Sequence, residues 1–473
     1  MLLLKIQIMK LALRLSVYLI VSFLCFNTSA QENHLTKEYK KQSIQTLSQL
    51  MNDFYVFPEV AKSTEEYLMV QLGKGHFDQF DNDESFAKAL TESVQSINKD
   101  KHMRIWENKP YEAPEQTPER LIEEQLDRRN RRRNYNDGFS SVKIMEGNVG
   151  YLDLRSFAGV GSGKEFADAY MKLIAQTDAV IIDVSKNGGG DPAMVQYLCS
   201  FFFKDKVHLN SLYFREGDRT MDFYTLEVVG GVKMTDIPLF VITGEKTFSG
   251  AEEFSYNMQT QKRATLIGVT TGGGANPGGT RGINQNLSVF IPTGMAINPI
   301  TKTNWEGVGV IPEIKTSAEE ALGKAHELAM PAAESYRNEN KVKFTKMFTE
   351  LNSTLDSYKK GQSEDVIVNS IKKCLDSKIL GESDINMLGY SYLTKYEKPA
   401  TAESIFKTNT VLFPNSSNVF DSYAEALMMK GNLELSAENY QKAINISTEN
   451  DDGNVEFYQA NLDKVKTLIK EKK

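Results

Sequence analysis

Apolar residues follow a helical period through the first part of the chain. Two sets recur with this spacing: Leu47, Leu50, Met51 and Phe54, then Phe86, Leu90, Val94 and Ile97. Between the two sets Pro58 disfavours helix at Phe57, so the pattern is interrupted there. Residues 98–106 read as a polar turn that leads into a short strand. These patterns predict a small helical domain over residues 31–106.

Short apolar runs alternate with helical patterns between residues 141 and 335. The run 179–184 is apolar almost throughout, as expected for a strand that is covered on both faces. Further strands are predicted at 149–154 and 237–243. Helices are predicted over 166–174, from 192 to about 203, from about 251, and over 317–329. Strands that alternate with helices indicate an α/β domain.

Helical patterns continue to the end of the chain. Residues 336–380 look helical and polar, and we expect a connecting segment there. Over 381–473, three pairs of similar residues are 34 positions apart, as in tetratricopeptide repeats: Leu393 and Leu427, Ala402 and Ser436, Phe406 and Tyr440. Two such units are fewer than an array usually needs, so the connector or the central domain would complete the stack. A generic pair of helical hairpins is the alternative.

The first thirty residues have the pattern of a secretory signal. Three basic residues precede an apolar run over 15–26, and small residues follow up to Ala30. We therefore predict cleavage after Ala30 and export to the periplasm or the medium, with no integral membrane segment left. An uncleaved anchor is the alternative, although the run is short for a membrane span.

Charge and cysteine content narrow the range of partners. Loss of the three basic residues would take the formal net charge from −7 to −10, which argues against a nucleic-acid partner. Residues 107–140 are charged and include the basic run 128–133, for which a linker or solvated helix is preferred over a docking site. Cys199 and Cys374 lack metal-ligand spacing, and free buried thiols are expected rather than a disulfide.

The segment from Thr247 to Pro312 carries most of the candidate chemistry. A strand, a turn with Ser249 and a helix from about Ala251 would place a hydroxyl beside a helix N-terminus, whose free N–H groups suit an oxyanion. Ser249 followed by Glu252 also matches a capping box, so helix capping is the alternative.

A second candidate element is the glycine loop Gly188-Gly189-Gly190, which lies between a predicted strand and helix. It lacks both the P-loop lysine pattern and the dinucleotide fingerprint. Its N–H groups could face a phosphate or a developing oxyanion. A simple tight turn is the alternative.

Several of these stretches occur in an order that resembles a known family. The matching pieces are residues 54–58, 100–102, 149–155, 183–190 and 247–312. They resemble the tail-specific (C-terminal-processing) serine peptidases, and more closely the branch with interphotoreceptor retinoid-binding protein modules and the tricorn protease core. The resemblance spans about residues 40–330 and implies a crotonase-like (Clp-protease-like) core of ββα units.

The resemblance also implies site residues. Ser249 would be the nucleophile, His102 the general base and acid, and Glu306 the group that orients the imidazole. Taken alone, His102 could be a structural turn residue and Glu306 part of an exposed turn. The oxyanion donors would be the backbone N–H groups of Gly250 and of Gly188 or Gly189.

Three departures from the family pattern matter. The processing enzymes carry a lysine base within Gly-Lys-Gly, and the corresponding place here is Gly274. An arginine that usually follows the loop aspartate is replaced by Ser185. The stretch between Trp106 and Val142 is too short for a PDZ domain, so recognition of peptide tails is not expected.

Together these observations predict an exported serine peptidase that acts through an acyl-enzyme at Ser249 on a peptide or protein substrate. No metal or organic cofactor is implied. The repeats would bind a protein partner or peptide, or pack as a scaffold. A non-catalytic module for an apolar ligand, and a scaffold in which only the repeats act, are the alternatives.

Overall fold

The computed structural model describes residues 35–109, 117–359 and 361–472. The predicted signal peptide lies outside these residues. The chain divides into two compact units, residues 1–336 and 337–473. Within the described ranges, no helix is both long and apolar enough to cross a membrane.

Three helices build the N-terminal part of the first unit: α2 (Lys37–Phe54), α3 (Pro58–Gly73) and α4 (Asp83–Asn98). The side chains of Thr36 and Asn82 cap α2 and α4 by accepting backbone N–H bonds. Pro58 occupies the first turn of α3, where its missing N–H costs nothing. The helices and the interruption at Pro58 are as predicted.

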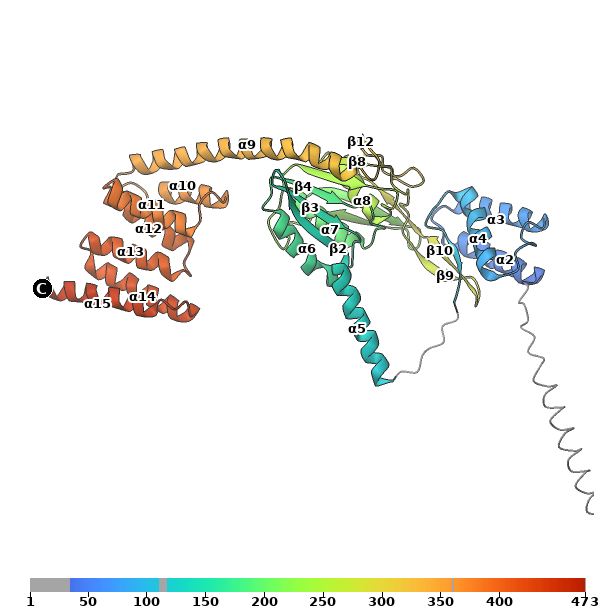
Figure 1. Cartoon of the computed structure of the whole chain (residues 1–473), viewed down its shortest axis with the longest axis horizontal. Coiled ribbons are helices and arrows are strands. Elements are labelled where there is room, and N and C mark those ends of the chain that lie inside the picture. Colours follow the sequence, from blue (N-terminus) through green and yellow to red (C-terminus); the bar gives the residue numbers. More distant parts are fainter. Residues whose placement is uncertain (1–34, 110–116, 360, 473) are drawn as a thin grey trace, which may run out of the picture. The chain divides into compact units, whose positions relative to one another are not determined.

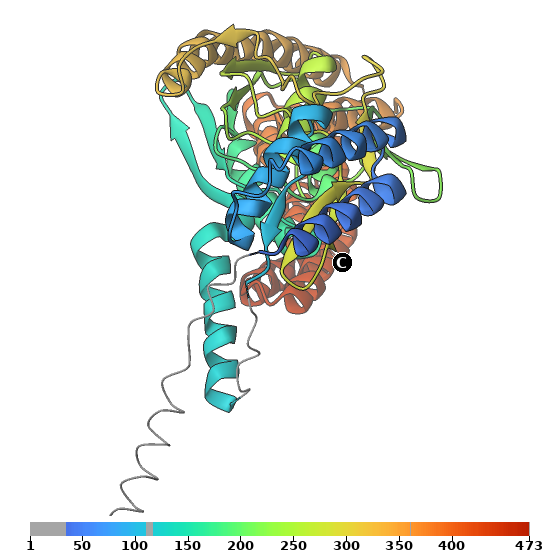
Figure 2. The same ribbon diagram turned by 90° about the vertical axis from the view of Figure 1, so that its right-hand side faces the viewer.

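A hairpin from far along the chain completes this part. The strand β1 (Ile105–Glu107) pairs antiparallel with β10 (Leu287–Pro292), which pairs with β9 (Gly278–Gly282). Val289 and Ile291 of β10 are buried in the same core as α2–α4, and the hairpin lies beside these helices (Figures 1 and 2). Helical periodicity could not show this contribution.

The central sheet has six strands in the order β12-β8-β7-β4-β3-β2. All neighbours are parallel except β2 and β3, which are antiparallel. The strands are β2 (Phe139–Met145), β3 (Val149–Leu154), β4 (Ala179–Asp183), β7 (Leu239–Thr243), β8 (Thr265–Gly268) and β12 (Ile314–Lys315). This is the mixed α/β architecture that the sequence predicts.

Helices cover both faces of this sheet (Figure 1). Because strand side chains alternate, Val180 and Ile182 enter one core while Ala179 and Ile181 enter the other. The first core also contains residues of α6 (Val160–Ile174), α7 (Pro192–Cys199) and α8 (Gly250–Thr260). The second contains a stripe of small residues on α9, namely Ala321, Ala325, Ala329 and Ala333.

Helix α9 is much longer than predicted. It runs from Ala321 to Ser357, with Pro331 inside it, rather than over 317–329. Alanines at every fourth position pack its first part against the sheet, and no glycine follows Gly323 to end it early. Part of the expected connector is therefore a continuation of the same helix.

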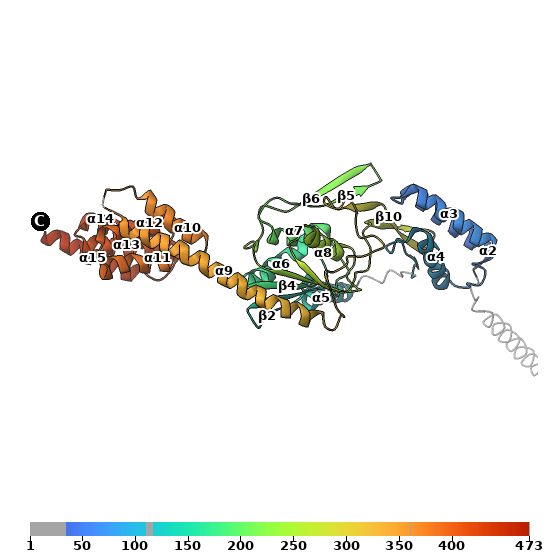
Figure 3. The ribbon, with the colours of Figure 1, turned by 90° about the horizontal axis from the view of Figure 1, so that it is seen from above.

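The remaining elements of the first unit surround this core. β5 (His208–Phe214) pairs with β6 (Arg219–Tyr224) and with β11 (Gly294–Ile297) in a third sheet, and the ribbon β5–β6 is visible in Figure 3. The predicted linker contains α5 (Pro118–Tyr135) and the short turn η1 (Asn136–Gly138). A second short turn, η2 (Ser200–Phe202), extends α7.

The second unit consists of helices (Figure 3). The last part of α9 and α10 (Asp365–Asp376) share one core with the helices that follow. Leu351 and Ile371 are buried there beside Phe406, so segments of the expected connector extend the stack. The later helices are α11 (Glu382–Tyr390) with the π-turn η3 (Ser391–Lys395), α12 (Pro399–Leu412), α13 (Ser417–Met429), α14 (Leu433–Asn450) and α15 (Val455–Glu471).

Cys199 and Cys374 are both buried and free, as expected. Burial raises the pKa of the Cys199 thiol well above its usual value. The thiol therefore stays protonated and unreactive near neutral pH.

Candidate active site

Ser249 lies at the turn between β7 and α8. Its backbone has φ 51° and ψ −121°, a combination that is strained for any residue with a side chain. Helix caps normally lie in the extended region. Of the capping box only one half has full hydrogen-bond geometry, because Glu252 accepts the Ser249 N–H while the hydroxyl makes no side-chain cap bond. Ser249 thus makes capping contacts with Glu252, and it also presents its hydroxyl at a sharp strand-to-helix turn of the kind that can hold a nucleophile.

Glu252 holds the serine turn against the next glycine-rich loop. Its fully buried carboxylate accepts the N–H of Ser249 at 2.9 Å, of Gly273 at 2.6 Å and of Gly274 at 2.8 Å. It also accepts a hydrogen bond from the Thr271 hydroxyl. Burial raises the pKa of this carboxyl, and the four donors oppose the rise. Glu252 therefore fixes both loops around Ser249.

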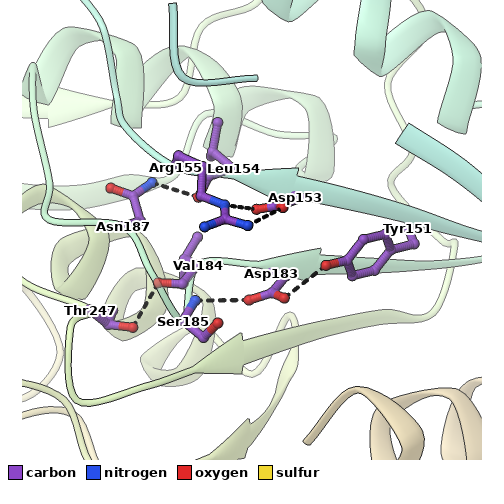
Figure 4. Close-up of polar contacts among 9 residues, drawn as sticks. All are labelled: Tyr151, Asp153, Leu154, Arg155, Asp183, Val184, Ser185, Asn187 and Thr247. Carbon is purple, nitrogen blue, oxygen red and sulfur yellow. Dashed lines mark hydrogen bonds and ion pairs between the residues drawn. The ribbon is translucent and has the colours of Figure 1, made fainter. Parts of the chain in front are cut away.

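The carboxyl ends of β3 and β4 fix the other glycine loop (Figure 4). The Asn187 amide donates to the Leu154 carbonyl at 3.1 Å, and the Thr247 hydroxyl donates to the Val184 carbonyl at 2.7 Å. Ser185, which stands where an arginine was expected by family resemblance, donates its N–H to Asp183 at 2.9 Å. The loop is thus held by neighbouring side chains without that arginine.

Gly189 brings this loop into contact with Ser249. It has φ 106°, and a Cβ atom added there would lie 2.9 Å from the Ser249 Cβ and 2.8 Å from the Gly250 nitrogen. The N–H of Gly189 is already donated to the Asn187 side chain at 2.8 Å. In the described residues the N–H groups of Gly188 and Gly250 have no such acceptor. These two groups are therefore the free donors beside the serine.

His102 reaches the same place from the N-terminal helices. It follows α4 in the turn before β1, and the Lys101 ammonium donates to the Gly272 carbonyl at 2.5 Å. The imidazole packs against Phe248, with ring centroids 4.6 Å apart, and against Phe290 of β10. The backbone N–H of His102 donates to the Asp100 carboxylate at 3.1 Å. The pairing of β1 with β10 thus positions the histidine.

Two carboxylates accompany the imidazole. One oxygen each of Asp100 and Glu306 and one nitrogen of His102 lie within 4.8 Å of one another. Asp100 is fully buried and accepts hydrogen bonds from Asn276 at 2.9 Å and from Tyr55 at 3.3 Å. Glu306 Oε2 accepts the Ala275 N–H at 2.6 Å. Glu306 Oε1 and His102 Nδ1 are both buried, and within the described residues neither has a hydrogen-bond partner.

The electrostatics follow from this burial. Burial and, to a smaller extent, the charge of Arg104 together lower the pKa of His102 to about 4. Burial and the nearby Asp100 charge raise the pKa of Glu306 to about 8. At neutral pH the imidazole is therefore neutral, the form that can accept a proton. The carboxyl pair shares a proton because two buried charges so close repel each other.

Ser249 and His102 line a single cavity of about 390 Å³. Gly188 and Gly250 also line it, and aromatic side chains such as Phe248 form much of its wall. Glu306 is not part of the wall but adjoins His102 from behind. The structure thus brings together a hydroxyl, an imidazole, a carboxyl and two free N–H donors from four separate parts of the chain.

Comparison with known protein families agrees with this architecture. Residues 148–316 match the model of peptidase family S41, and residues 30–134 match the N-terminal domain of peptidase S41 in eukaryotic IRBP. Together the two matches span more than half of the chain. The chain belongs to peptidase family S41. It is accordingly a serine-type peptidase by family, as the sequence analysis predicts.

The solved structures that match this chain include a candidate peptidase, mature CPAF and the tricorn protease. A candidate peptidase from Parabacteroides merdae has 17% identity and a TM-score of 0.46, with 62% of this chain and 96% of that protein covered. Mature CPAF has 12% identity and a TM-score of 0.43, with 63% of this chain and 98% of that protein covered. The tricorn protease has 14% identity and a TM-score of 0.39, with 63% of this chain and 37% of that protein covered.

The position of the expected S41 lysine is closed to any side chain. A Cβ atom added at Gly274 would lie 2.2 Å from Phe248 Cζ and 2.7 Å from His102 Cε1. The ring of His102 therefore occupies the space beside Gly274 that a side chain there would need. A glycine at the position expected for the lysine is thus what leaves room for the His102 imidazole.

Two residues near the site were not assigned a role from sequence. Asp100 adjoins His102 in the matched tripeptide, so its proximity could have been anticipated. Glu252 was considered only as a cap partner, and its contacts with residues 271–274 depend on tertiary structure. Among the described residues, Asp100, His102 and Glu306 are also the group whose spacing could suit a metal ion.

Proposed function

We propose that this S41 peptidase cleaves peptide bonds through an acyl-enzyme at Ser249. The observation that carries the proposal is the shared cavity, which is lined by a strained serine, a neutral imidazole and the two glycines with free N–H donors. His102 acts as general base and acid, and Glu306 orients it through Nδ1. Gly188 is preferred to Gly189 as the second oxyanion donor, since the Gly189 N–H is already bonded.

Peptide hydrolysis at this site proceeds in two stages, acylation of Ser249 and hydrolysis of the acyl-enzyme. The Ser249 oxygen attacks the substrate carbonyl carbon while His102 Nε2 takes the hydroxyl proton. The oxyanion that forms accepts hydrogen bonds from the N–H groups of Gly250 and Gly188. The C–N bond then breaks as His102 returns the proton to the leaving amine. Water then attacks the acyl carbon while His102 takes its proton, and the C–O bond to Ser249 breaks as His102 returns that proton to the serine oxygen.

The test is intact-mass analysis after reaction with a fluorophosphonate probe. A single adduct on Ser249 is expected, absent in Ser249→Ala and slowed by at least about 100-fold in His102→Ala. His326→Ala is a matched control, because the His326 imidazole lies outside the cavity and is within hydrogen-bond distance of the Glu146 backbone carbonyl. A folded wild-type protein that forms no adduct would contradict the proposal and favour a non-catalytic binding module.

We further propose export of the mature chain after removal of residues 1–30. The support is the pattern of a basic start, an apolar run and small residues before Gln31. Expression of the full chain in a Gram-negative host, followed by mass measurement of the periplasmic fraction, tests this. A species that begins at Gln31 is expected, and retention of the full-length mass in the membrane would contradict it.

We propose that the helices of residues 337–473 form a repeat module that binds a protein or peptide. The 34-residue correspondence is matched by burial, since Phe406 and Tyr440 are both almost inaccessible. A pull-down should use residues 337–473, because the last part of α9 and α10 share the core of the later helices. Retention of no partner from a host extract would leave this unit a scaffold only.

A further inference from the structure

One buried carboxylate in the wall of the active-site cavity has no cationic partner among the described residues. Glu253 lies one helical turn after Ser249 in α8, is 5% exposed and lines the cavity. The Asn210 amide favours its charged form, but in the described part of the chain no basic side chain forms an ion pair with it. Its neighbour Glu252, on the same helix, accepts four hydrogen bonds. The charge of Glu253 is therefore much less compensated than that of Glu252.

Two neutral amides lie beside Glu253. Asn257 is one turn from Glu253 on α8, and Asn210 lies on β5 near the carboxylate. Neither amide is in the described lining of the cavity. A neutral amide supplies no counter-charge, so the buried carboxylate is uncompensated on its cavity side.

Apolar residues form the approach to this cluster. Leu212 and Ala296 are opposite one another in the β5–β11 pair, and both line the cavity. Asn210 is two residues before Leu212, so both side chains lie on one face of β5. The described lining includes no lysine or arginine, and Glu253 is its one carboxylate. The wall therefore combines an apolar channel with an uncompensated acid.

The missing component is a positive charge. Burial without a counter-ion raises the pKa of Glu253 to about 7, and the nearby Asn210 amide opposes the rise only in part. A cation brought by a ligand would stabilise the charged carboxylate, since buried charges are tolerated when they are paired.

Building on the proposed function, we propose that Glu253 is a specificity-determining residue that selects a lysine or arginine side chain. This would be the side chain of the residue whose carbonyl Ser249 attacks. Its methylene stem would pass Leu212 and Ala296, and its cationic end would pair with the Glu253 carboxylate.

The experiment compares the rates at which Ser249 is labelled by two peptide phosphonate esters. They differ only at the residue next to phosphorus, which carries either the arginine or the citrulline side chain. Citrulline has nearly the same shape without the charge. We expect the arginine probe to react at least about 10-fold faster with the wild type, because a site with an unpaired buried acid rejects the uncharged isostere.

Variants assign the preference to Glu253. Glu253→Gln should remove the rate difference, while Glu253→Asp, which withdraws the charge by one methylene, should reduce it. Glu245→Gln removes the same charge from an exposed position near the site and should retain the difference. If Glu253→Gln fails to fold, as judged by thermal unfolding, the aspartate variant still decides.

A simple fluorophosphonate without a side chain separates this inference from the function on which it rests. If it labels Ser249 but the two phosphonates react equally, the subsite is wrong and the peptidase proposal stands. A difference that persists in both Glu253 variants would also overturn the subsite. If the simple probe does not label folded protein, the proposed function itself fails.

Discussion

The two halves of the candidate site are built in different ways. The nucleophile half comes from one strand–turn–helix segment, in which Thr247, Ser249 and Glu252 are all within six residues. The base half joins the turn after α4 to the loop after β11, which are about two hundred residues apart in the chain. A local motif therefore encodes the first half, and only strand pairing creates the second.

The halves also differ in how fully they are bonded. Glu252 accepts four hydrogen bonds and leaves the serine turn no freedom. His102 Nδ1 and Glu306 Oε1 are buried, and neither makes a hydrogen bond within the described residues. We infer that the nucleophile half is preorganised, whereas the base half completes its bonding when a proton or substrate arrives. Each prediction below tests one side of this contrast.

The largest effect is expected in the preorganised half. Gly189→Ala adds a methyl group 2.9 Å from the Ser249 Cβ at a backbone with φ 106°. A displacement of the nucleophile by about 1 Å should slow fluorophosphonate labelling by about 100-fold. Gly161→Ala, where an added Cβ meets no atom within 4 Å, is the control. Equal rates in the two variants would show that the serine turn is not rigid.

A smaller effect is expected in the base half. Glu306→Gln keeps the shape of the side chain but removes its ability to stabilise the imidazolium, so labelling should slow by about 10-fold or more. Glu319→Gln, an exposed change of the same charge, should not alter the rate. A wild-type rate in Glu306→Gln would reduce Glu306 to a structural loop residue.

The pH dependence should report His102. Since burial and Arg104 lower the pKa of His102 to about 4, the imidazole is a free base above that value. Labelling should be lost only as pH falls through about 4. Arg104→Gln removes a positive charge, which raises the pKa of His102 and moves this limb upward by about 0.5 unit. Labelling rates between pH 3.5 and 8 measure both, and a limb near 6.5 in the wild type would contradict the burial of the base.

The smallest effect concerns metal. Because the mechanism proposed for Ser249 uses an imidazole rather than a metal-bound water, treatment with a chelator should leave the labelling rate unchanged. Added zinc should slow labelling if it binds Asp100, His102 and Glu306, whose ligand atoms lie within 4.8 Å of one another. Loss of labelling on chelation would instead assign these three residues to a metal site.

The sequence alone was sufficient for the local features. Apolar periodicity gave α2, α4 and the buried strand β4, because these patterns depend on neighbours a few residues away. The position of Ser249 between a strand and a helix was likewise predictable from the sequence. The end of α9 was not predictable, because the alanines that bury its first part form a stripe whose role depends on the sheet against which it packs.

Only the tertiary structure decided the relation of His102 to Ser249. The pairing of β1 with β10 brings the imidazole to the cavity and is not visible in a local pattern. The glycine at position 274 is visible in the sequence, but that it makes room for His102 is a tertiary fact. The same holds for Glu253. Local sequence cannot distinguish its carboxylate, which has no cationic partner among the described residues, from that of Glu252, which accepts four hydrogen bonds. Sequence periodicity records which face of an element is buried, whereas charge compensation depends on groups brought from elsewhere in the chain.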